Sequence, residues 1–169
     1  MFKISLDSIV KVDRIRFGSP NFFKFVATNK ELKILATRFK FLDVLSLSVE
    51  LIIRKSARDC WDVVGQLRGV VVQACNSTGV PLRETLDFLI EERYVRSVGN
   101  QEEVEVQVGV AEPLENEAIN IGELVAQSLA IAATPWPRAP DAPNMYTSGE
   151  ELPDHPFAGL AALKRQPPK

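Results

Sequence analysis

Two cysteines and one histidine are the side chains of this chain best suited to metal binding or nucleophilic chemistry. They are Cys60, Cys75 and His155. A structural zinc ion usually takes four thiolate or imidazole ligands, so these residues form an incomplete set unless a carboxylate joins them. His155 also lies beside Pro156 in a proline-rich stretch, where nothing rigid would orient an imidazole for proton transfer. We therefore expect no metal site, and we expect Cys75 to be a small buried apolar residue rather than a reactive thiol.

The usual sequence signatures of enzymes do not occur in the chain. It has no phosphate-binding Gly-x-x-x-x-Gly-Lys loop, no Gly-x-Ser-x-Gly nucleophile turn and no His-Glu-x-x-His zinc helix. Adjacent glutamates at positions 91–92 and 102–103 have the spacing of solvated strand and turn charges, and spacing alone does not identify a buried acid–base pair. The sequence predicts a non-enzymatic protein with no catalytic residues, no cofactor and no small-molecule substrate.

A short segment near the C-terminus has residue types that favour contact with a partner. Trp136, Pro137 and Arg138 follow Pro135, which ends the preceding helix because its ring has no N–H and clashes with the previous turn. The tryptophan and the arginine are therefore left on an irregular segment, and these two residue types are common anchors of protein interfaces. The alternative, that Trp136 covers the core beneath the helix end, stays open.

Charge is distributed unevenly along the chain. The net charge of −2 and an acidic isoelectric point do not indicate a basic nucleic-acid-binding domain. Residues 1–60 nevertheless contain 12 Lys/Arg against 6 Asp/Glu, which leaves 8 against 16 for residues 61–169. Basic side chains of the first third could contact RNA phosphates, and the alternative is an ordinary solvated surface. These candidates are Arg14, Arg16, Lys24, Lys30, Lys33, Arg38 and Lys40.

Two helices are indicated by their N-terminal residues and by apolar periodicity. Thr28 and Glu31 have the spacing of a capping box, in which each side chain binds the backbone N–H of the other residue. Asn120 and Glu123 have the same spacing before the second helix. Apolar side chains at helical spacing then form one face of each helix. They are Leu32, Leu35, Ala36 and Phe39 in the first, and Ile121, Leu124, Val125, Leu129 and Ala132 in the second.

Alternating apolar residues predict strands over 2–6, 21–26, 45–53, 61–73, 86–94 and 104–110. Short turns join most of them, which favours antiparallel pairing because parallel neighbours need longer connections. Gly65 and Gly69 lie on the apolar face of the strand at 61–73 and indicate a bulge or the close approach of another element, such as a helix. Residues 112–118 are predicted to be an acidic loop. The predicted class is α+β, a mostly antiparallel sheet with helices on one face and a flexible C-terminal tail.

The chain is predicted to divide into a single α+β domain over residues 1–138 and a flexible proline-rich segment over 139–169 that ends in a short apolar motif. Residues 139–156 have no apolar periodicity. Pro156, Phe157 and Leu160 begin the apolar motif, which would dock either on the domain or on a partner. No apolar run is long enough to cross a bilayer, and the first residues lack the apolar stretch of a signal peptide. We expect a cytoplasmic protein with no membrane contact.

Three segments follow the order of one known family. Residues 119–138 have a capped helix start with Gly-Glu, an alanine- and leucine-rich helix, and then Pro-Trp-Pro-Arg. Residues 155–164 read His-Pro-Phe-Ala-Gly-Leu-Ala-Ala-Leu-Lys, and residues 69–75 are an apolar strand that runs into Cys75. Together these segments resemble the YceD-type family, the large ribosomal RNA subunit accumulation proteins, over roughly residues 61–164.

The chain departs from the pattern of this family at several positions. Asn120 replaces the usual acidic residue, and Asp141-Ala142 follows where the family often has Pro-Gly. Some members carry Cys-x-x-Cys where this chain has Cys75 and Thr78. The missing second cysteine removes the case for a metal, so we expect hydrogen bonds of Thr78, together with Pro81, to hold this turn.

The resemblance implies a non-enzymatic factor in bacterial large ribosomal subunit biogenesis that supports the accumulation of 23S rRNA. Its partner would be the preribosomal large subunit, contacted through rRNA or through a basic ribosomal protein. Acidic residues would suit the basic protein; they are Glu102, Glu103, Glu105, Glu112, Glu115 and Glu117. The alternative is a cytoplasmic protein-interaction adaptor unrelated to ribosomes, anchored through the Trp136 segment and the Phe157 motif.

Overall fold

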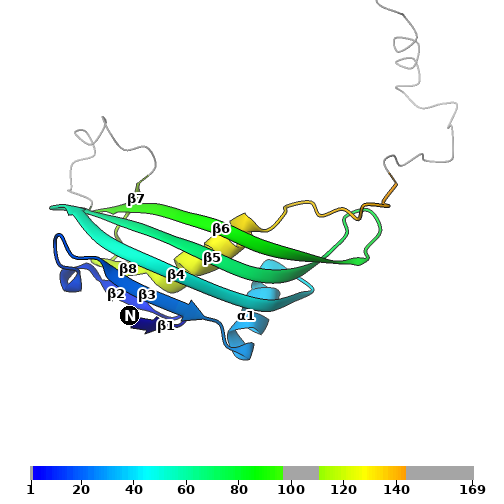
Figure 1. Cartoon of the computed structure of the whole chain (residues 1–169), viewed down its shortest axis with the longest axis horizontal. Coiled ribbons are helices and arrows are strands. Elements are labelled where there is room, and N and C mark those ends of the chain that lie inside the picture. Colours follow the sequence, from blue (N-terminus) through cyan, green and yellow to red (C-terminus); the bar gives the residue numbers. More distant parts are fainter. Residues whose placement is uncertain (1, 97–110, 144–169) are drawn as a thin grey trace, which may run out of the picture.

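Three long, curved strands dominate the computed structural model, which describes residues 2–96 and 111–143 (Figure 1). They are β4 (Asp43–Ala57), β5 (Cys60–Ala74) and β6 (Pro81–Val95), each 15 residues long. These strands contain the segments predicted at 45–53, 61–73 and 86–94, which confirms three of the predicted strands. The strand predicted at 104–110 lies outside the described residues.

Short strands extend the sheet on both sides, in the order β1-β3-β4-β5-β6-β7. The pairs β3–β4, β4–β5 and β5–β6 are antiparallel, whereas β1 and β7 pair in parallel with β3 and β6 at the edges. Two further strands, β2 and β8, form a separate antiparallel ribbon, and β2 runs into a short 3-10 helix over Val12–Arg14. The remaining bounds are β1 Phe2–Ile4, β2 Ile9–Lys11, β3 Asn21–Val26, β7 Glu112–Pro113 and β8 Ala118–Asn120.

The strand content corrects one expectation and confirms another. Residues 112–118 are not wholly a loop, because Glu112 and Pro113 pair with β6 and Ala118 begins β8. Backbone pairing with neighbouring strands therefore holds both ends of this acidic segment. The sheet as a whole is mostly antiparallel, as predicted, and together with two helices it gives an α+β fold.

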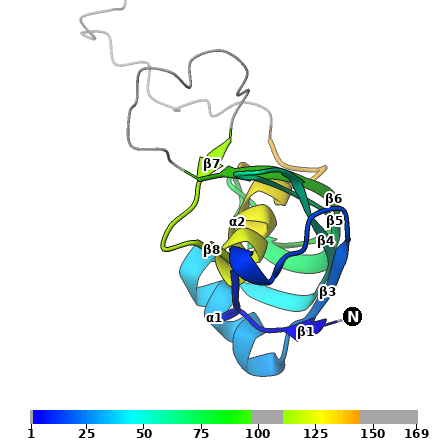
Figure 2. The same cartoon turned by 90° about the vertical axis from the view of Figure 1, so that its left-hand side faces the viewer.

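The two helices, α1 (Asn29–Phe39) and α2 (Ile121–Ala132), lie on the same side of the sheet (Figure 2). The capping box that begins α1 is complete: Thr28 Oγ1 accepts the Glu31 N–H at 3.4 Å, and Glu31 accepts the Thr28 N–H at 2.8 Å. Among the residues that the structure describes, neither helix has the length and apolar character needed to cross a bilayer.

The capping box predicted for α2 is only half formed. Asn120 Oδ1 accepts the Glu123 N–H at 3.0 Å, as expected. The Glu123 carboxylate does not return to Asn120 but binds both terminal nitrogens of Arg38 on α1, at 2.6 and 2.8 Å. A bidentate guanidinium is a stronger partner than one backbone N–H, and the hydrogen bonds from Arg38 lower the pKa of Glu123.

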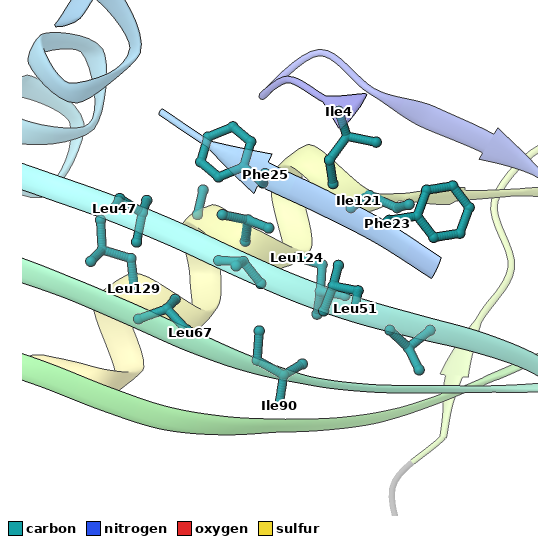
Figure 3. Close-up of a cluster of buried hydrophobic side chains, with 14 of the residues drawn as sticks. Ile4, Phe23, Phe25, Leu47, Leu51, Leu67, Ile90, Ile121, Leu124 and Leu129 are labelled. Atoms are coloured by element: carbon teal, nitrogen blue, oxygen red, sulfur yellow. The ribbon is translucent and has the colours of Figure 1, made fainter. Parts of the chain in front are cut away.

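One continuous core fills the space between the sheet and the helices (Figure 3). Alternate side chains of the long strands point into it, and α2 contributes a broad apolar face that includes the predicted one. Leu45 is an exception to the predicted alternation, because the pairing of β4 with β5 shifts between Val44 and Ser46. This bulge buries Val44 and leaves Leu45 43% exposed.

Another element does approach Gly65 and Gly69 closely, as their positions predict, but this element is the strand β4 rather than a helix. A Cβ on Gly65 would lie 2.3 Å from the Glu50 carbonyl oxygen and 2.5 Å from a methyl carbon of Leu51. At Gly69 the nearest atom would be the Ser46 carbonyl oxygen at 3.0 Å. Both glycines face leucines of β4 directly across the ladder, so side chains of the neighbouring strand occupy the space above them.

The N-terminal segment connects the two helices. The Leu6 N–H donates to the Glu31 carboxylate at 3.0 Å, and the Ser8 carbonyl accepts the N–H groups of Ile121 and Gly122 at 3.1 and 3.3 Å. The Ser8 carbonyl thus supplies an acceptor for two N–H groups at the start of α2 that have no acceptor within the helix. These contacts also bring the backbone of Leu6 directly against Gly122.

Candidate functional site

The turn between β5 and β6, which we call the Cys75 turn (residues 75–80), closes on itself through backbone hydrogen bonds. The Cys75 N–H donates to the Val80 carbonyl and the Gly79 N–H donates to the Cys75 carbonyl, both at 2.8 Å. Gly79 has a φ of +73°, a conformation that glycine adopts readily. The turn lies at the end of the β5–β6 pair, where Ala74 is opposite Pro81.

The Cys75 thiol is buried, with 3% of the residue exposed, as the sequence predicts. Its sulfur accepts the N–H of Ala139 at 3.3 Å. The hydrogen bond with the Thr78 side chain, followed by that from Ala139, lowers the pKa of the thiol from 9.0 to about 7. Thr78 therefore does hydrogen-bond within the turn, and its partner is the sulfur. The lowered pKa departs from the unreactive thiol expected from the sequence. Its largest cause, Thr78, lies three residues away within the turn, whereas the second, Ala139, lies 64 positions away, where spacing within the turn could not reveal it.

This lowered pKa predicts how stability depends on pH. The folded chain favours the thiolate, so Cys75 contributes stability above its ordinary pKa near 9, and this contribution is lost as the pH falls through about 7. In urea unfolding from pH 6 to pH 9, the free-energy difference between the wild type and Cys75→Ala should therefore grow with pH. Cys60→Ala, measured in parallel, accounts for general effects of removing a thiol. A difference that stays constant or shrinks with rising pH would contradict the prediction.

The segment that follows α2, which we call the Trp136 elbow (residues 134–139), is bound to the Cys75 turn and to the strands beside it. The Asn76 N–H donates to the Pro137 carbonyl at 2.8 Å, and the Ala139 N–H donates to Cys75. The Thr134 hydroxyl donates to the Glu84 carboxylate at 2.6 Å. The elbow is thus fastened to the sheet on both sides of Trp136.

Packing continues beyond the predicted domain boundary at residue 138. Ala139 and Ala142 are buried against Cys75 and Leu82, in a small apolar cluster separate from the main core. Residues 139–143 therefore pack on the domain, although their sequence has no apolar periodicity. Two alanines suffice here because the hydrogen bonds to the Cys75 turn hold this stretch of backbone in place.

Trp136 does not cover the core, which decides the alternative that the sequence leaves open. Its side chain is among the most exposed large apolar groups of the described residues, with 73% of the residue accessible. Arg138 is also exposed, and its guanidinium donates to the Pro143 carbonyl. Binding of a partner by Trp136, Pro137 and Arg138 remains a prediction. Pro156, Phe157 and Leu160 lie outside the described residues.

The seven basic candidates do not form one surface. Lys30, Lys33 and Lys40 are exposed on or just after α1. Arg38 is engaged by Glu123, and Lys24 forms an ion pair with Glu50 at 2.8 Å on the opposite face of the sheet from α1. Arg14 and Arg16 are exposed near the β2–β8 ribbon. Contact with RNA phosphates by these residues therefore remains a prediction.

An acidic hollow of about 290 Å³ lies between α2, β6 and β7. Glu92, Glu112 and Glu115 line it, together with Tyr94 and Leu124. Burial, helped by the charge of Glu112, raises the pKa of Glu92, and burial raises that of Tyr94 to about 12. Sequence reasoning missed this grouping, because only the pairing of β7 with β6 brings Glu112 beside Glu92.

The other acidic candidates have different surroundings. Glu117 pairs with Arg96, whereas Glu102, Glu103 and Glu105 lie outside the described residues. Within residues 2–96 and 111–143, no three His, Cys, Asp or Glu side chains are grouped so that they could hold a metal ion.

Comparison of the chain with protein-family models, with curated proteins and with solved structures finds no match.

Proposed function

We propose that this protein is a non-enzymatic, cytoplasmic factor in the biogenesis of the bacterial large ribosomal subunit, and that it contacts the preribosomal particle through the Trp136 elbow. The observation that carries this proposal is the exposure of Trp136, 73% of which is accessible on a backbone fastened at both sides. An exposed aromatic ring normally costs free energy in water, and a fixed one is suited to filling a pocket of a partner.

The arrangement of the motif segments supports the proposal. The resemblance to the YceD-type family rests in part on the apolar strand before Cys75 and on the segment that ends in Pro-Trp-Pro-Arg, which are about sixty residues apart in the chain. The Asn76–Pro137 and Cys75–Ala139 hydrogen bonds join these two segments at one end of the sheet. A shared surface gives a physical reason for both segments to belong to one signature.

The contact that the elbow suits best is with a folded partner rather than with a particular RNA sequence. Trp136 and Arg138 are two side chains on one short loop, and the described strands carry no row of exposed aromatic residues such as an RNA-stacking sheet presents. A basic ribosomal protein bound to the particle would also be attracted by the acidic side chains near Glu92 and Glu112. The lysines of α1 would add contacts to rRNA phosphates.

Deletion of the gene, followed by rescue, tests the proposal. The deletion strain should show a lower ratio of large- to small-subunit rRNA, which the intact chain restores. The double variant Trp136→Ala with Arg138→Ala should fail to restore it while folding normally, because both side chains are exposed. Ile131→Ala, which removes another apolar side chain that is 68% exposed, is the matched control and should rescue fully.

Two results would argue against the proposal. An unchanged rRNA ratio in the deletion strain would remove the ribosomal role and favour an adaptor of another kind. Full rescue by the double variant would remove the elbow from the contact. Sedimentation of native extract on a sucrose gradient adds an independent measurement, since the proposal expects the chain to migrate with large-subunit precursors rather than only as free protein.

A further inference from the structure

Glu84 is an unusual residue at its position in the sheet. On β6 it follows the alternation of Leu86 and Ile90, which point into the core, so its carboxylate lies on the inner side of the sheet. It also lies close to the C-terminal end of α2, because α2 ends at Ala132 and Thr134 contacts Glu84. A negative charge at this end of a helix is unfavourable for stability, since the helix dipole is negative there.

The carboxylate is occupied by donors from the elbow and from the neighbouring strand. Glu84 accepts the Thr134 hydroxyl at 2.6 Å and the Thr134 N–H at 3.2 Å. It also accepts a hydrogen bond from Nε2 of Gln73 on β5 at 3.0 Å, and the same nitrogen donates to the Thr134 carbonyl at 3.1 Å. Each of the polar groups of Thr134 is therefore hydrogen-bonded to Glu84 or to Gln73. Thr134 lies two residues before Trp136.

We infer that Glu84 is the positioning residue of the Trp136 elbow: its carboxylate fixes Thr134 so that the elbow can reach the Cys75 turn and present Trp136 and Arg138 in one place. The Asn76–Pro137 and Cys75–Ala139 hydrogen bonds hold the elbow after Trp136, and Glu84 holds it before Trp136. A loop ordered before binding does not have to be ordered by the partner, which strengthens the contact. The consequence for binding rests on the proposed function, whereas the fastening itself does not.

Amide hydrogen exchange of the full-length chain tests the fastening without any partner. Glu84→Ala should speed exchange about tenfold at Thr134, Asn76 and Ala139, because hydrogen bonds to a charged acceptor are among the stronger ones. Glu84→Gln should have a smaller effect, since the amide keeps one oxygen that can accept a hydrogen bond from Thr134. Its NH₂ group, however, cannot accept the bonds that the second carboxylate oxygen accepts. Glu91→Gln, an exposed glutamate on the same strand, is the matched control and should leave all three amides unchanged.

A role in general stability predicts a different pattern, in which exchange speeds by a similar factor across the core of β5 as well. That pattern, or faster exchange at Thr134 alone, would overturn the inference whatever the fate of the proposed function. Because Glu84→Gln keeps the shape of the side chain, it gives the same test if Glu84→Ala folds poorly.

Rescue of the rRNA ratio in the deletion strain then separates the two proposals. If positioning matters, Glu84→Ala should rescue poorly although Trp136 and Arg138 are both present. Full rescue by a Glu84→Ala chain whose elbow amides exchange quickly would overturn the positioning role. The Trp136→Ala with Arg138→Ala result would still decide the proposed function separately.

Discussion

Gly122→Ala is expected to destabilise the fold by about 3 kcal/mol or more, since overpacking against fixed backbone is among the costlier single substitutions. A Cβ on Gly122 would lie 1.6 Å from the Leu6 carbonyl oxygen, 2.3 Å from its carbonyl carbon and 2.9 Å from its Cα. All three atoms are backbone, so no side chain can rotate away to make room. Either the N-terminal segment or the first turn of α2 would have to move.

Such a movement would also break hydrogen bonds at the start of α2. The Ser8 carbonyl that accepts the N–H groups of Ile121 and Gly122 belongs to the same turn as Leu6. Urea unfolding followed by circular dichroism measures the loss. Gln127→Ala, an exposed position on the same helix, is the control and should change the free energy of unfolding by no more than about 0.5 kcal/mol. A Gly122→Ala chain as stable as this control would mean that Leu6 does not lie against α2.

Leu129→Ala should cost about 3 kcal/mol of folding free energy, which lies within the range for a leucine removed from a well-packed core. Leu129 is completely buried where α2 crosses the long strands, close to Leu47 and Leu67 (Figure 3). The loss combines the transfer free energy of the missing carbons with the cavity that the surrounding strands cannot fill. Among them β5, which carries Leu67, is paired with β4 on one side and with β6 on the other, which limits its movement into the cavity.

Ile131→Ala provides a matched comparison, because it removes a similar apolar side chain two residues further along the same helix. Ile131 is 68% exposed, so its loss should change the free energy of unfolding by about 0.5 kcal/mol or less. Thermal or urea unfolding of both variants measures the difference. Equal losses would contradict the placement of α2, since they would mean that both side chains are equally buried.

The elements that depend on local sequence were predictable, because their signals lie within a few residues. The capping box of Thr28 and Glu31 marks the start of α1, and the spacing of Leu35 and its neighbours gives the buried face of that helix. Strict alternation predicts the three long strands, since successive side chains of a strand point to opposite faces. A mostly antiparallel sheet follows from the short turns between them.

The predictions that failed are those in which a distant partner competes with a local one. Glu123 has the right spacing to complete a capping box, but Arg38, 85 residues away in the chain, binds it instead. Leu45 follows the alternation of its strand, but a bulge in the pairing with β5 turns it outward. The acidic segment over residues 112–118 is predicted to be a loop, but its first residues pair with β6 and its last residue pairs with β2.

The helices, the long strands and the residue types of the candidate contact follow from periodicity, caps and prolines, which act over short stretches of chain. Three features appear only in the folded chain: the exposure of Trp136, the hydrogen bonds that join the elbow to the Cys75 turn and to Glu84, and the packing of Gly122 against Leu6. These facts depend on which residues the curved sheet and α2 bring together. Such contacts are set by the register of pairing and the packing of the core, and the spacing of residues within one segment carries no information about either.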